Sequence, residues 1–146
     1  MPDYRMSMMA EFESGTVVVY SYLWAREFDR GEDAGRKDRP VCVQILVRPK
    51  SAASGLTPLY MPITSQRPLA GRLAIEIPQL ECQRTGLRAP AWIIVDEFNI
   101  DETVPSVHLR SLKPKGSFSQ KFTANIRKAL LQAVRSRNYR IVPRRI

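Results

Sequence analysis

The stretch VCVQILV, Val41–Val47, decides the fold, because it is an almost unbroken run of β-branched and apolar residues. Such a run is typical of a strand that is buried on both faces of a sheet. Pro49–Gly55 has the composition of a turn, and Leu56–Ile63 is the apolar segment that follows it. The sequence therefore predicts that Val41–Val47 and Leu56–Ile63 pair as a hairpin.

Other segments of the chain also have the composition of short strands. They are Thr16–Tyr22, Leu73–Ile77, Ala91–Phe98 and Val107–Leu112. Between them, Leu23–Asp38 is predicted to be a long mobile loop and Gln79–Gly86 to form about one helical turn. Because short antiparallel strands protect their edges by closing up, we expect a small barrel or a curled sheet.

The periodicity changes near Ser119, where apolar residues begin to recur every four positions. They are Phe118, Phe122, Ile126, Leu130 and Val134. This spacing predicts an amphipathic helix that Ser117 or Ser119 caps and that stops near Asn138. The fold class is thus mainly β with a C-terminal α-helix.

Length and composition indicate one domain without covalent or metal staples. The chain has 146 residues, of which 44% are hydrophobic, and this is enough to form a single core. Cys42 and Cys82 are far apart in sequence, and His108 is the only histidine, so we expect neither a metal site nor a cofactor. No apolar run has the length of a signal peptide or membrane span, which predicts a soluble cytoplasmic protein.

The formal net charge of +9 is unevenly distributed. Residues 1–102 contain 12 basic and 14 acidic residues, whereas residues 103–146 contain 11 basic residues and no acidic one. A clustered positive charge favours a nucleic acid or an acidic protein as partner. A basic face that is merely solvated is the alternative, and composition does not distinguish the two.

The usual catalytic motifs are absent, since the chain has no nucleophile triad and no glycine-rich phosphate loop. Polar residues instead gather near strand ends, at Glu32 and Asp33, Arg39, Thr64–Gln66, and Asp96 and Glu97. Such residues could build a ribonuclease, because the 2′-hydroxyl of RNA is itself the nucleophile. Arginine can hold the phosphate, hydroxyl groups can donate hydrogen bonds to it, and a carboxylate can serve as base.

Several short motifs occur in a particular order. They are Gly15–Tyr20, Gly31–Gly35, Arg39–Val41, Pro62–Gln66 and Val95–Asn99. In order and spacing they resemble the PemK/MazF/Kid toxins of bacterial toxin-antitoxin systems, over about Ser14 to Arg135. The resemblance is closest to a diverged branch in which a tryptophan opens the loop, as Trp24 does, and Lys-Asp-Arg-Pro closes it, as residues 37–40 do.

This resemblance implies a small SH3-like β-barrel of the CcdB/MazF type and an endoribonuclease that cleaves single-stranded RNA without metal. It places the catalytic pair on Arg39 and Thr64. The general base remains open among three carboxylates, Glu32, Asp96 and Glu97. In one branch of the family an aspartate on the later strand, here Asp96, assists the chemistry. An arginine accompanies it two residues earlier, where this chain has Ile94.

The resemblance also implies RNA contacts at Ser65, Gln66, Lys37 and Trp24, a homodimer, and an acidic antitoxin protein as partner. Trp24 could stack on bases or pack at the hinge of the loop, whereas Trp92, in an apolar segment, is predicted to lie in the core. Arg39 could alternatively pair with Asp38 or Glu97, and Thr64 could be a turn residue.

The expected organisation is an N-terminal extension at residues 1–13, a toxin-like domain at residues 14–137 and a basic tail at residues 138–146. Two other functions stay open beside the ribonuclease. One is a toxin of the same fold that inhibits a protein such as DNA gyrase. The other is a nucleic-acid-binding module without catalysis, because a fold by itself does not determine function.

Overall fold

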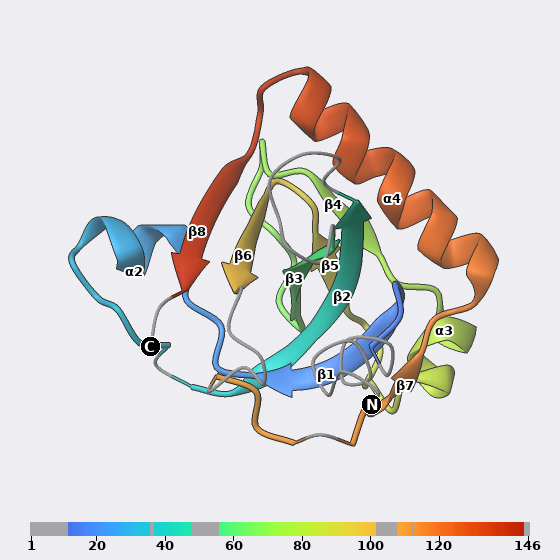
Figure 1. The fold of residues 1–146 in the computed structure, drawn as a ribbon. Helices are drawn as coiled ribbons and strands as arrows, with labels where there is room; N and C mark the ends of the chain where they lie inside the picture. Colours follow the sequence, from blue (N-terminus) through green and yellow to red (C-terminus); the bar gives the residue numbers. More distant parts are fainter. Residues whose placement is uncertain (1–11, 36, 48–55, 102–107, 112, 145–146) are drawn as a thin grey trace.

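The predicted hairpin is the centre of the protein. The computed structural model describes residues 12–35, 37–47, 56–101, 108–111 and 113–144 (Figure 1). Strands β2 (Arg39–Val47) and β3 (Leu56–Thr64) are antiparallel, with Val41 opposite Pro62 and Val47 opposite Leu56. The pairing of Val41–Val47 with Leu56–Ile63 is confirmed, while the predicted turn at Pro49–Gly55 lies outside the described residues.

The sheet curls around this hairpin into a half-barrel that is compatible with a small barrel (Figure 1). Its order is β4-β5-β3-β2-β1-β7, and β6 pairs with both β3 and β8. The remaining strands are β1 (Thr16–Tyr20), β4 (Ala74–Glu76), β5 (Trp92–Ile94), β6 (Glu97–Asp101), β7 (Gly116–Ser117) and β8 (Arg140–Arg144). All pairs are antiparallel except β6 with β8.

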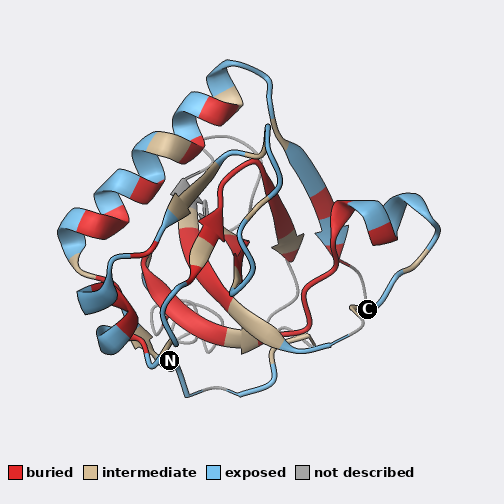
Figure 2. Ribbon diagram, turned by 180° about the vertical axis from the view of Figure 1, so that it is seen from behind, coloured by how far each residue is buried: buried red, intermediate tan, exposed pale blue. Residues whose placement is uncertain are grey.

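The C-terminal helix is confirmed as α4 (Gln120–Arg135). Ser119 is its N-cap, and the Ser119 Oγ accepts a hydrogen bond of 3.1 Å from the backbone N–H of Phe122. Phe122, Ile126 and Leu130 are buried against the sheet. Buried and exposed residues therefore alternate along α4, as its periodicity predicts (Figure 2).

Residues of β2 alternate between two hydrophobic clusters on opposite faces of the sheet. Val41 and Val43 belong to a cluster with Tyr20 and Tyr60, whose rings stack with centroids 4.3 Å apart. Cys42 belongs to the other cluster, which α4 covers. Both faces of β2 are thus buried, which is why Val41–Val47 is apolar except for the buried Gln44.

Three predicted segments within residues 14–137 differ from the structure. The predicted strand Ala91–Phe98 is divided into β5 and β6, because the chain changes partner near Asp96 from β4 to β8. The predicted loop Leu23–Asp38 contains a short helix, α2 (Ala25–Asp29). Of Val107–Leu112, the ends lie outside the described residues, and the described part pairs only through a single bridge between Leu109 and Tyr20.

The predicted helical turn after Pro78 is α3 (Gln79–Arg84). Residues 138–146 were predicted to be a tail outside the domain, but residues 140–144 form strand β8. This strand runs parallel to β6, with Glu97 opposite Arg140 and Asp101 opposite Arg144. Val142 and Arg144 are buried there. The segment is therefore part of the sheet, beside α2 (Figure 1).

Candidate functional site

A pocket of about 620 Å³ opens where β2 begins and β3 ends. Six residues predicted from the sequence line it: Trp24, Lys37, Arg39, Thr64, Ser65 and Gln66. The structure thus gathers in one wall the two predicted catalytic residues and the four predicted RNA contacts.

Strand register explains why Arg39 and Thr64 meet. Val41 lies opposite Pro62, and extending this antiparallel register by two residues places Arg39 opposite Thr64. Directly opposite residues of an antiparallel pair have their side chains on the same face of the sheet. The two side chains therefore lie on the same face at the end of the hairpin, and both line the pocket although they are 25 positions apart in sequence.

Arg39 is half-buried and has no ion-pair partner among the described residues. Its guanidinium carbon lies 4.9 Å from the ring centre of Trp24, and its Nε is buried without a hydrogen-bond partner. Burial lowers the pKa of Arg39, nearby Arg26 lowers it further, and Glu27 opposes the shift. Arg39 is therefore a cation without a neutralising ion pair in the described part of the chain.

The two alternative partners of Arg39 are engaged elsewhere. Asp38 accepts a hydrogen bond of 2.7 Å from Nε of Arg110. Glu97 lies in the network around Arg72 described below. The arrangement favours a ligand-binding role of Arg39 over a loop-fixing one.

Trp24 is packed, with an exposed fraction of 7%. The guanidinium of Arg26 lies 4.8 Å from its ring centre, on which Arg39 also packs, and Tyr22 meets its edge at 5.0 Å. Little of the ring is left for a base. Of its two predicted roles the structure favours packing, and Trp24 positions two arginines at the pocket.

Sequence reasoning missed three further arginines in the pocket wall, Arg26, Arg67 and Arg72. Arg26 and Arg67, like Lys37, have no carboxylate partner among the described residues. The missed signal was closeness in sequence to predicted site residues, since Arg26 stands two positions after Trp24 and Arg67 directly follows Gln66. In the described structure, four cations of one pocket wall, Arg39 included, lack a neutralising carboxylate partner, and such a wall fits an anionic ligand.

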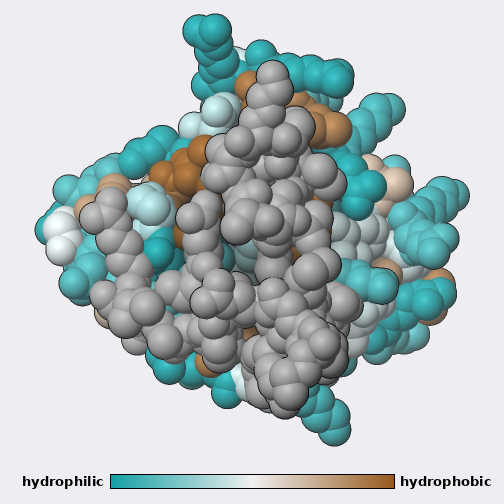
Figure 3. Space-filling model, viewed as in Figure 1, coloured by the Kyte–Doolittle hydropathy of each residue, from teal (hydrophilic) through white to brown (hydrophobic). Residues whose placement is uncertain are grey.

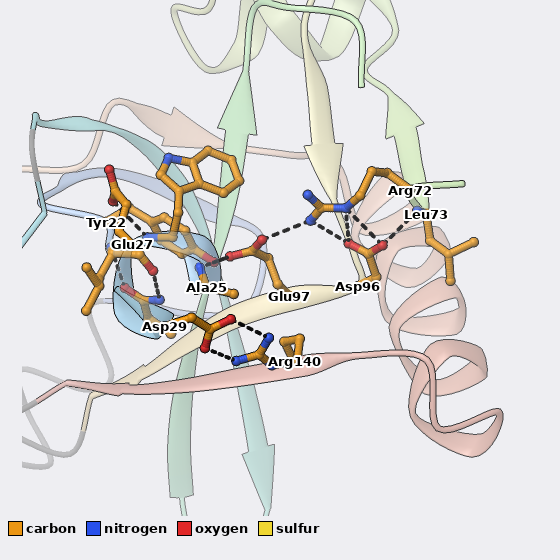
Figure 4. A network of polar contacts seen from close by, with 12 residues as sticks. Tyr22, Ala25, Glu27, Asp29, Arg72, Leu73, Asp96, Glu97 and Arg140 are labelled. Carbon is orange, nitrogen blue, oxygen red and sulfur yellow. Dashed lines mark hydrogen bonds and ion pairs between the residues drawn. The ribbon is translucent and has the colours of Figure 1, made fainter. Parts of the chain in front are cut away.

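Arg72 differs because two carboxylates neutralise it (Figure 4). Its Nη2 lies 2.8 Å from Oδ1 of Asp96 and 2.9 Å from Oε1 of Glu97. Glu97 also accepts hydrogen bonds of 2.9 Å from the Tyr22 hydroxyl and the Ala25 N–H. Burial and the Glu97 carboxylate raise the pKa of Tyr22. This network fastens the pocket wall to β6.

The three predicted candidates for the general base lie outside the pocket wall. Asp96 and Glu97 are buried and hydrogen-bonded in the Arg72 network. Glu32 is half-buried, and its N–H donates to the carbonyl of Glu27 at 3.1 Å. Among the described residues, the acidic side chain that lines the pocket is Glu27, which is also buried, at 4% exposed, and whose Oε1 accepts a hydrogen bond from the Trp24 N–H at 3.2 Å.

Gly35 allows the loop to close on the pocket. A Cβ at this position would come within 2.5 Å of the Tyr22 carbonyl oxygen, so only glycine permits this approach. The second half of the loop, with Lys37, thereby reaches the wall that Tyr22 and Trp24 begin.

The fold and the pocket define a small mainly β protein with a cationic site for an anionic ligand. A comparison with protein-family models gives no match, and a comparison with curated proteins gives none either. Within the described residues, no helix is long and apolar enough to cross a membrane. The described side chains also include no group of three or more histidine, cysteine or acidic residues placed to hold a metal ion.

Proposed function

We propose that this protein is an endoribonuclease of the PemK/MazF toxin type, which cleaves single-stranded RNA in the cationic pocket. One observation carries the proposal: Arg39 and Thr64, distant in sequence, adjoin in a wall whose cations lack ion-pair partners among the described residues. A phosphate needs such donors, since guanidinium and hydroxyl groups bond its oxygens. The proposed fold type is the matching SH3-like barrel.

The reaction requires no group beyond the RNA and the pocket. The 2′-oxygen attacks phosphorus as a base removes its proton, and the bond from phosphorus to the 5′-oxygen breaks. The protonated base then gives a proton, directly or through water, to the leaving 5′-oxygen, so the products are a 2′,3′-cyclic phosphate and a 5′-hydroxyl. Arg39 and the Thr64 hydroxyl stabilise the negative charge that develops on the phosphoryl oxygens.

The deciding experiment incubates the purified protein with a long single-stranded RNA in EDTA. Cleavage that leaves these two ends supports the proposal. An Arg39→Ala preparation, purified in parallel, controls for contaminating ribonuclease. RNA that is bound but not cut would favour the nucleic-acid-binding module, an alternative consistent with the apolar Ile94 in the pocket wall.

Thr64→Val is expected to slow cleavage roughly tenfold, because it removes one hydrogen bond to a charged oxygen while keeping the side-chain shape. Thr64→Ser is the matched control, since serine keeps the hydroxyl. Both variants are measured by the initial rate on one short RNA. The hydroxyl of Thr64 also accepts a hydrogen bond from the Gln66 N–H at 3.1 Å. Full activity of Thr64→Val would therefore leave Thr64 with this turn role only.

The general base is proposed to be Glu27, because it is the carboxylate in the pocket wall. Glu27→Gln is expected to lower the cleavage rate roughly a hundredfold, the usual scale for removing a general base. Glutamine can still accept the hydrogen bond from Trp24, so the start of α2 is kept. Glu32→Gln is the matched control and should cleave at the wild-type rate. If Glu32→Gln slows cleavage and Glu27→Gln does not, Glu32 and not Glu27 is the general base.

From the same resemblance we propose that the protein is a homodimer and that its protein partner is an acidic antitoxin. The exposed face of α4 fits an acidic partner, because Lys121, Arg127, Lys128 and Arg135 are exposed there. Hydrophilic residues dominate the described surface in the view of Figure 3. Light scattering of the purified protein tests the dimer.

A further inference from the structure

Trp92, the second tryptophan of the chain, lies beside the pocket and is only half-buried, although the apolar strand predicted a core position. It stands directly opposite Thr64 in the pairing of β3 with β5. Opposite residues of an antiparallel pair share a face, so the Trp92 side chain lies on the face of the sheet that carries Thr64.

Arg67 connects Trp92 to the pocket. Its guanidinium carbon lies 5.9 Å from the Trp92 ring centre, at the outer limit of a cation–π contact. Arg67 also lines the pocket, is exposed and has no carboxylate partner among the described residues. One arginine thus reaches both the anion site and an accessible aromatic ring.

The two tryptophans differ in what surrounds them. Two guanidiniums lie under 5 Å from the Trp24 ring centre, and that residue is 7% exposed. Trp92 is only half-buried, and the one guanidinium that lies over its ring among the described residues, that of the exposed Arg67, is 5.9 Å from the ring centre. Of the two rings, Trp92 is therefore the one that can take a further planar group.

We propose that Trp92 and Arg67 form a nucleobase subsite that adjoins the phosphate pocket. The inference deepens the proposed function and rests on it for the identity of the ligand as RNA. Adjacent strands are about 4.8 Å apart, so Trp92 is one strand spacing from Thr64 and roughly 10 Å from Arg39. A nucleotide whose phosphate lies between Arg39 and Thr64 places a neighbouring base over Trp92.

The chemistry of this subsite selects single-stranded nucleic acid. Every base has a π face that can stack on an indole, whereas the bases of a duplex are already stacked on one another. Arg67 pairs with the adjoining phosphate or stacks on the same base. The subsite accordingly tolerates different bases and rejects duplexes.

Fluorescence tests the subsite, because the chain contains only two tryptophans. The probe is a single-stranded 2′-O-methyl RNA, which lacks the nucleophilic hydroxyl and is not cut. It should quench the wild-type emission saturably, and Trp92→Phe should remove most of that quenching. Tripolyphosphate, which has charge but no base, should bind with little quenching. Equal quenching in wild type and Trp92→Phe would overturn the subsite.

Affinity provides the second measurement. Trp92→Leu should bind the 2′-O-methyl RNA roughly tenfold more weakly, the scale of one lost stacking contact, and tripolyphosphate unchanged. Equal weakening toward both probes would assign Trp92 a structural role and overturn the subsite. If the protein cleaves RNA but the Trp92 variants show none of these effects, the proposed function stands and the subsite is wrong. If the Trp92 variants show these effects but the protein does not cleave RNA, the subsite stands and the nuclease proposal is wrong.

Discussion

Replacing Arg39 by alanine is expected to lower the rate of RNA cleavage about a hundredfold or more, the usual cost of removing one preorganised donor to the transition state. Arg39 adjoins Thr64 in the pocket wall and has no ion-pair partner among the described residues. In the described part of the chain, the N–H donors of the Arg39 guanidinium therefore make no ion pair with another side chain. Single-turnover cleavage of a short RNA measures the effect.

The folded state should tolerate this change. Burial and the nearby Arg26 lower the pKa of Arg39, which means that the folded protein disfavours its charged form. Arg39→Ala removes this cost but also removes the packing of the guanidinium on the Trp24 ring, so its thermal midpoint should stay close to that of the wild type. Arg84→Ala is a matched control, because Arg84 is exposed and pairs with Glu81 outside the pocket wall. A folded Arg39→Ala that cleaves at the wild-type rate would remove Arg39 from the mechanism.

Replacing Arg144 by methionine is expected to lower the free energy of unfolding by about 2 to 4 kcal/mol, because it leaves buried acceptors without their donor. Arg144 is 5% exposed, and its Nη1 donates to the Ser21 carbonyl and, at 3.2 Å, to Oδ1 of Asn99. Its Nη2 lies 2.8 Å from Nδ1 of His108, which must then be the acceptor. Urea unfolding followed by circular dichroism measures the loss.

Arg140→Met is the control on the same strand. Arg140 is exposed and pairs at 2.7 Å with Asp29, and exposed ion pairs contribute little to stability. Deleting residues 138–146 should be far more damaging than either substitution, because it removes the whole of β8 from beside β6. Arg144→Met and Arg140→Met of equal stability would show that the buried contacts of Arg144 contribute nothing.

The consequences of losing β8 extend to the pocket. Asn99, which accepts from Arg144, also accepts from the Leu23 N–H at 3.0 Å and donates to the Leu23 carbonyl at 2.8 Å. Leu23 directly precedes Trp24 in the pocket wall. A segment that sequence reasoning set outside the domain therefore supports the wall of the site.

Local patterns predicted the parts of the fold whose cause is local. Val41–Val47 is apolar except for Gln44 because both faces of β2 are covered, and its partner follows it closely in sequence. The four-residue period and Ser119 predicted α4 and its cap. In contrast, β8 is short, contains Pro143 and pairs with a strand about 40 residues away, so no local pattern indicates it.

The site shows the same division. Order and spacing pointed to Arg39, Thr64 and their neighbours, and strand register then placed them side by side. Which carboxylate faces the pocket could not be predicted, because it depends on where Arg72 lies. Arg72 binds Asp96 and Glu97, and a carboxylate of α2, Glu27, lines the pocket in their place.

The sequence by itself determined a mainly β chain, a central hairpin, a C-terminal helix and a group of polar residues at strand ends. These follow from hydrophobic periodicity and turn composition, which act between neighbours in the chain. Tertiary structure alone decided that the Arg39 guanidinium packs on the Trp24 ring, that Trp92 stays accessible and that residues 140–144 complete the sheet. Each of these depends on contacts between segments far apart in sequence, and the free energy of such contacts is set only when the whole chain has folded.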